Sequence, residues 1–96
     1  MKIIHKHGMQ MDGAATLISL PPEAVVRHVE YVVAEHRVLL WIEVPAEIHM
    51  GSGLVDRQFR LFATGKGIPG AAVYVGSAVD QYQPEVYHVY ETTGVH

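Results

Sequence analysis

The sequence predicts an all-β domain of about seven short, mainly antiparallel strands in a small sandwich or partly open barrel, with a β-rich α+β fold as the variant. Two observations support this prediction. Apolar and polar residues alternate through most of the chain, which is the period of a strand with one buried face. The chain of 96 residues also has no room for the long crossover helices that a parallel sheet requires.

Length and composition narrow the class of protein. A chain of 96 residues organises one hydrophobic core, so residues 1–96 are expected to form a single domain. Apolar residues make up 49% of the chain and charged residues 18%, which is the balance of a folded protein. The net charge is -3 and the basic residues are dispersed, so nucleic-acid binding is not expected.

Three absences in the sequence predict a cytoplasmic protein without a membrane partner. The chain has no cysteine, which excludes disulfides, thiolate metal ligands and a cysteine nucleophile. The first seven residues lack the apolar core of a signal peptide. No apolar run approaches the roughly 20 residues that span a bilayer.

The first two strands are expected at residues 2–7 and 15–20, joined by a turn near Asp12-Gly13. The next segment, from Pro21 to Val33, fits two interpretations. Its prolines and Glu23 suit the first turn of a helix. Its valines, five in the nine residues 25–33, favour a strand in which Val25, Arg27, Val29, Tyr31 and Val33 share one face.

The clearest alternation lies in residues 37–44, before Pro45 ends the run. The apolar residues on one face are Val38, Leu40, Ile42 and Val44. Residues 57–63 predict a second central strand, with Phe59, Leu61 and Ala63 on one face. The connection between these strands, near residues 46–56, is predicted to be a flexible loop because of its Gly-Ser-Gly centre, and long loops often carry function.

Two more strands are expected at residues 72–79 and 86–92, and the second of these is rich in Val, Tyr and Thr. In the first of these, Val73, Val75 and Val79 are expected to share a face. Gly76 interrupts the strand and indicates a β-bulge or a close approach of another segment. Most connections in the chain are expected to be hairpins.

Seven histidines suggest metal binding as one hypothesis. His5 and His7 are two residues apart, so they point to the same face of a strand, and together with His88 they would supply three ligands for Zn²⁺ or another divalent metal. The competing interpretation is an edge strand whose Lys and His residues discourage pairing with other chains. No other cofactor is expected.

Signatures of catalysis are missing from the sequence. None of Ser19, Ser52 and Ser77 lies in the Gly-Xaa-Ser-Xaa-Gly pattern of a nucleophile elbow. The Gly-rich run at residues 63–70 carries a lysine but lacks the spacing and the following helix of a phosphate-binding loop. The sequence therefore favours a protein that is not an enzyme.

Binding is the favoured function, and two segments provide the candidate contacts. The aromatic residues Tyr87 and Tyr90 are three apart in a predicted strand, so they point to opposite faces and one of them is expected to be exposed. Exposed Tyr and Trp side chains are enriched at protein interfaces. The candidate binding residues are Ile48, His49, Met50 and Leu54 in the loop, and Tyr87 and Tyr90 in the last strand.

Short motifs in this order resemble a family of small uncharacterised proteins of tailed bacteriophages and prophages. The motifs lie at residues 1–6, 20–21, 40–41, 57–65, 68–69, 74–77 and 86–91. The chain departs from the family pattern in having Ala63 where a glycine is usual, and a longer loop around Gly51–Gly53. The resemblance implies a phage setting and hence a host cytoplasm, but no chemistry.

The leading hypothesis is a non-enzymatic phage accessory protein that engages a host protein or a small molecule. The alternatives are a metal-binding protein or metal-dependent enzyme that uses His5 and His7, and a minor structural component of the virion. A homo-oligomer is compatible with each of these, because a small β-domain has sheet faces and edges to cover.

Overall fold

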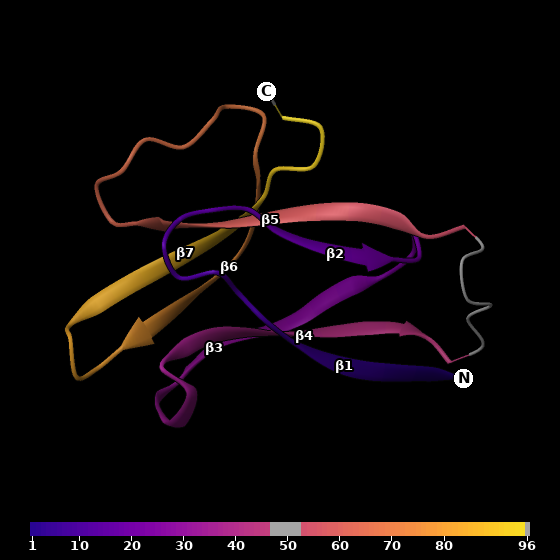
Figure 1. The fold of residues 1–96 in the computed structure, drawn as a ribbon, viewed down its shortest axis with the longest axis horizontal. Coiled ribbons are helices and arrows are strands. Elements are labelled where there is room, and N and C mark those ends of the chain that lie inside the picture. The colour runs from indigo at the N-terminus through magenta and orange to yellow at the C-terminus, as the bar shows by residue number, and fades with distance from the viewer. Residues whose placement is uncertain (47–52, 96) are drawn as a thin grey trace.

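The computed structural model of the chain, which describes residues 1–46 and 53–95, is all-β (Figure 1). These residues form seven strands in two antiparallel sheets that do not close into a barrel. The strands are β1 (Lys2–Gly8), β2 (Thr16–Leu20), β3 (Val25–Val32), β4 (Arg37–Pro45), β5 (Val55–Ala63), β6 (Val73–Asp80) and β7 (Glu85–Glu91). A short 3-10 turn, η1 (Val33–Glu35), joins β3 to β4.

The two sheets have different widths. One contains three strands in the order β1-β4-β3, and the other contains four in the order β2-β5-β7-β6. Among consecutive strands, only β3–β4 and β6–β7 pair directly. The expectation that most connections are hairpins is therefore wrong. The turn near Asp12-Gly13 does follow β1, but it leads into the other sheet, because the chain repeatedly crosses between the layers (Figure 1).

The core lies between the sheets and is built on the alternation of β4. Val38, Leu40 and Ile42 are fully buried, as the sequence pattern predicts. They meet Phe59 of β5 and Val89 of β7, which are equally buried. Complete burial of an apolar side chain of this size contributes about 1.5–3 kcal/mol, so this layer contributes a large part of the fold's stability.

The segment whose conformation was open between strand and helix is a strand, β3, as its valines indicate. The predicted common face is correct only in part, because the pairing with β4 shifts register between Val26 and His28. This bulge turns Arg27 outward. Val29 and Tyr31 pack against the core as predicted, but Val26 joins them in place of Val25, which is exposed.

Gly76 in β6 shows both features that the sequence predicts there, a β-bulge and the close approach of another segment. The register with β7 shifts between Tyr74 and Gly76, so a bulge lies at Val75. A Cβ atom on Gly76 would lie 2.9 Å from Cγ2 of Val29, which shows that β3 approaches closely at this point. The bulge also corrects the predicted face: Val75 packs against the core, whereas Val79 points outward and is 55% exposed.

Candidate binding groove

The sandwich is closed on one side and open on the other. On the closed side β3 contacts β6, where Val29 lies against Gly76. Counted from this seam, β1 is the third strand of its sheet and β2 is the fourth strand of the other. The open side is therefore the side of β1 and β2, the strands farthest from this seam in their sheets.

A mostly apolar groove of about 360 Å³ lies at this open side. Its volume falls within the range of small-molecule and side-chain binding sites. Three strands and two adjoining loops contribute to its wall, and one of the lining residues, Leu54, is a binding residue that the sequence predicts. The lining residues are His5 and His7 of β1, Ser19 and Leu20 of β2, Val44 of β4, and Pro21 and Leu54 from the loops.

The backbone of β1 leaves one edge open. Ala46 N–H donates to the Met1 carbonyl at 3.1 Å, and Met9 N–H donates to the Val38 carbonyl at 2.9 Å. These bonds fix the odd-numbered residues of β1 as those whose backbone groups face β4. The N–H and C=O groups of Lys2, Ile4 and Lys6 therefore point away from β4, and no strand among residues 1–46 and 53–95 pairs with them.

The edge of β2 is open in the same way. Thr92 N–H donates to the Gln58 carbonyl at 2.7 Å, so the backbone of Gln58 faces β7 and not β2. Leu17, which lies opposite Gln58, and Ser19 consequently direct their backbone groups away from β5. Leu17 is 64% exposed. The groove thus lies between two strand edges that have no strand partner in the described part of the chain.

Among the described residues that line the groove, only His5 and His7 are ionisable. His5 and His7 are in register with the core residues Ile42 and Leu40, so both point to the inner face. Burial lowers the pKa of His7, and the neighbouring His5 lowers it further. His7 therefore remains neutral down to a lower pH than a solvated histidine does.

His88 does not join this pair. It lies on the outward face of the four-stranded sheet, where its Nδ1 is 2.8 Å from Ser77 Oγ and its Nε2 is 2.9 Å from Thr64 Oγ1. The described residues contain no group of three or more His, Cys, Asp or Glu side chains placed to hold a metal ion. The structure therefore does not assemble the predicted set of His5, His7 and His88.

Tyr87 and Tyr90 point to opposite faces of β7, as their spacing predicts. Tyr87 packs against the core and stacks on Tyr31, with ring centroids 6.0 Å apart. Tyr90 lies on the outward face, edge-on to Phe62 at 5.7 Å and to Tyr74 at 5.4 Å. Neither tyrosine lines the groove.

The remaining predicted binding residues, Ile48, His49 and Met50, lie outside the described residues. The loop predicted near residues 46–56 extends too far at its C-terminal end, because β5 already begins at Val55. Sequence reasoning also missed Ser19, Leu20 and Pro21. The one local signal was that residues 16–20 carry no charge and no proline, which marks an unprotected edge strand.

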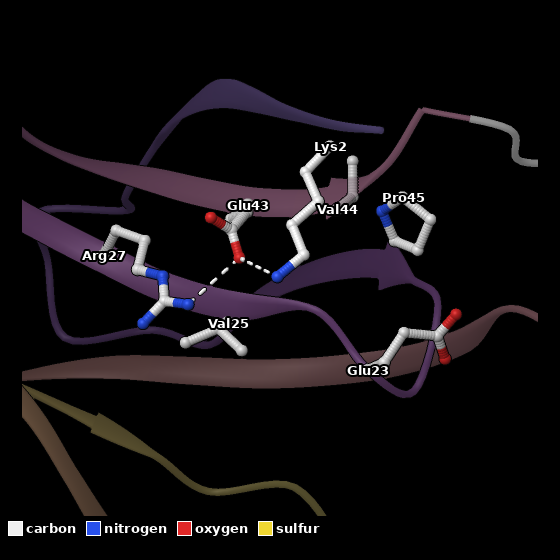
Figure 2. Close-up of a pocket in the computed structure, with 7 residues that line it drawn as sticks. All are labelled: Lys2, Glu23, Val25, Arg27, Glu43, Val44 and Pro45. Atoms are coloured by element: carbon white, nitrogen blue, oxygen red, sulfur yellow. Dashed lines mark hydrogen bonds and ion pairs between the residues drawn. The ribbon is translucent and has the colours of Figure 1, made fainter.

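A charged cluster lies on the outer face of the narrower sheet, next to the edge of β1 (Figure 2). Arg27 donates to Glu43 at 3.0 Å, and Lys2 lies 3.6 Å from the same carboxylate oxygen. The hydrogen bond from Arg27, assisted by the charge of Lys2, lowers the pKa of Glu43. Two cations therefore share one carboxylate here. Glu23 also borders this pocket of about 160 Å³ without joining either cation in an ion pair.

Fold and groove together define the class: a small antiparallel β-sandwich with an apolar groove between two strand edges. The chain belongs to the family described as a domain of unknown function, DUF7352, whose model matches residues 1–96. No curated protein and no solved structure matches the chain. In the part of the chain that the structure describes, no helix is long and apolar enough to cross a membrane.

Proposed function

We propose that this protein is a non-enzymatic binding module and that the groove between β1 and β2 is its docking site. The observation that carries the proposal is the apolar lining of the groove, which includes the exposed side chain of Leu54. Apolar surface that a partner covers is removed from water, and this stabilises the complex by roughly 25 cal/mol per Å².

The partner we propose is an extended segment of another protein. The open edges of β1 and β2 offer backbone donors and acceptors that a small apolar molecule would leave unused. Addition of a strand to a sheet edge is a general mode of peptide recognition, in which backbone bonds supply affinity and side-chain pockets supply specificity. The resemblance to phage proteins supports a phage accessory role, with a host protein as the source of this segment.

A comparison of two variants tests the docking site. Tagged wild-type protein, Leu54→Asp and Val73→Asp are used to capture proteins from a bacterial host lysate, followed by quantitative mass spectrometry. Both substituted side chains are exposed, but Leu54 lines the groove and Val73 lies on β6 away from it. A charge in an apolar site is costly to desolvate, so Leu54→Asp should reduce recovery of the partner at least about tenfold while Val73→Asp retains it.

The opposite result would move the site elsewhere. Equal recovery of the same partner by Leu54→Asp and wild-type protein, together with loss on Val73→Asp, would place the interface at β6, away from the groove. Thermal unfolding of each variant provides the control for folding.

A further inference from the structure

We propose that the groove accepts a strand that adds to the edge of β1, with apolar side chains towards the groove and acidic side chains at two outward positions. This inference rests on the proposed function and specifies the chemistry of its partner.

The backbone of β1 sets the register of such a strand. Lys2, Ile4 and Lys6 direct their N–H and C=O groups to the open edge, so an added strand would form its ladder with these three residues. The side chains of the added strand would alternate, as those of β1 do. Half of them would face outward beside Lys2, Ile4 and Lys6, and half would face the groove beside Ile3, His5 and His7.

The inward half of the partner is expected to be mainly apolar. An inward side chain would enter the groove lined by Leu20, Val44 and Leu54, and would cover Ile3, which is 45% exposed. The described lining contains no carboxylate and no Lys or Arg that would pair with a charged side chain. A charge placed here would lose its hydration without a fixed counter-charge.

The outward half of the partner meets positive charge. The first acidic residue of the chain is Asp12, so β1 carries Lys2 and Lys6 with no carboxylate of its own. The side chains of these lysines are 68% and 56% exposed. Opposite charges at facing positions of neighbouring strands stabilise the pair.

The existing partners of the two lysines leave this charge available. Lys2 lies 3.6 Å from Glu43, whose carboxylate is held more closely by Arg27 (Figure 2). Lys6 lies 3.7 Å from Glu35. Both distances exceed the usual length of a hydrogen bond, and exposed pairs of this kind are weak. The spacing of the lysines places the two acidic residues of the partner four positions apart, whichever direction the added strand runs.

Synthetic peptides test this pattern directly. The probe has seven residues, with glutamate at the second and sixth positions, threonine at the fourth and valine elsewhere. The control peptide has lysine in place of both glutamates. Binding to ¹⁵N-labelled protein is followed by amide chemical shifts and by hydrogen exchange.

The acidic peptide should bind about fivefold or more tightly than the lysine peptide, since two cross-strand charge pairs separate them. It should slow exchange of the Ile4 and Lys6 amides, which face the open edge, at least about tenfold. The His5 amide faces β4 in the free protein and should change little.

Two variants separate charge from backbone pairing. The double substitution Lys2→Glu and Lys6→Glu should reverse the preference between the peptides. Ile4→Pro removes one N–H at the open edge and should abolish binding, whereas Ile4→Thr should retain it. Because proline could disturb β1, an acidic peptide N-methylated on alternate amides serves as the second test and should not bind wild-type protein.

Several outcomes would overturn the inference. They are binding of neither peptide, equal binding of both, protection of amides outside β1, and self-association of the protein through the Ile4 and Lys6 amides. Equal binding that is lost in Leu54→Asp would refute the acidic pattern alone and leave the groove as the docking site. Peptide binding that Leu54→Asp does not change would refute the proposed function as well.

Discussion

Replacement of Glu91 by glutamine should remove a strong ion pair at the edge of the core. Arg57 of β5 donates through Nε and one terminal nitrogen to both carboxylate oxygens of Glu91 in β7, at 2.9 Å and 2.7 Å. Its other terminal nitrogen donates to the Ala24 carbonyl at 2.6 Å, just before β3. This one guanidinium therefore links β5 and β7 to the loop that precedes β3, and the two charged side chains are only 17% and 20% exposed.

The magnitude follows from the bonds that are lost. A hydrogen bond to a charged group contributes about 1.5–3 kcal/mol, and the substituted glutamine would keep the shape of the side chain with one neutral acceptor. We expect Glu91→Gln to lower the free energy of unfolding by about 2 kcal/mol at pH 7. For a domain of this size, that loss lowers Tm by roughly 10 °C.

The pH dependence of the stability provides an independent test of this contribution. The hydrogen bonds from Arg57 lower the pKa of Glu91, and Thr93 contributes in the same direction. Its stabilising contribution is therefore complete above the ordinary carboxyl pKa of 4.5, and it is lost as the pH falls from there through the lowered folded-state pKa. The difference between wild type and Glu91→Gln should shrink over that interval.

Urea unfolding of wild type, Glu91→Gln and the matched control Glu35→Gln measures these effects. Glu35 is 46% exposed and 3.7 Å from Lys6, so its substitution should cost less than about 0.5 kcal/mol. Equal losses in the two variants, or a loss in Glu91→Gln that persists in full at about pH 3, would refute the reasoning.

Two further predictions concern the groove wall and the seam. Because burial lowers the pKa of His7 below 6.5, the unfolded chain binds the proton first, so stability should fall as the pH drops below about 6.5; His7→Gln should show a smaller fall between about pH 7 and 5 in urea unfolding. An unchanged pH profile would contradict this assignment. Gly76→Ala should destabilise the fold by about 1–2 kcal/mol, since the new Cβ would lie 2.9 Å from Val29. In a double-mutant cycle, Val29→Ala should recover part of that loss, and strict additivity would show that the two residues do not clash.

Local alternation predicted the strands well because it depends on neighbouring residues in one segment. Val38, Leu40 and Ile42 are in the core as their period of two requires. The pattern failed where an extra residue changed the phase. At the bulges of Arg27 and Val75 the side chains after the bulge exchange faces, so Val79 points outward although it shares parity with the inward Val75.

The site was harder to predict than the strands because it depends on which strands lie at the edges. Residue type predicts His5 and His7 as metal ligands and loop position predicts Leu54 as a binding residue, and the structure places all three in the lining of the groove. Residue type also predicts His88 as a ligand, but β7 lies inside the other sheet and its outward face carries this residue. Strand order and sheet width are set by contacts between distant segments, which alternation does not encode.

Hydrogen exchange of the protein, alone and with its captured partner, tests the central claim most directly. The account predicts that the partner slows exchange at the open edges of the groove, at Ile4 and Lys6 of β1 or at Leu17 and Ser19 of β2, while the outward face around Tyr74 is unchanged. Protection confined to that outward aromatic face, with the groove edges exchanging as in the free protein, would contradict it.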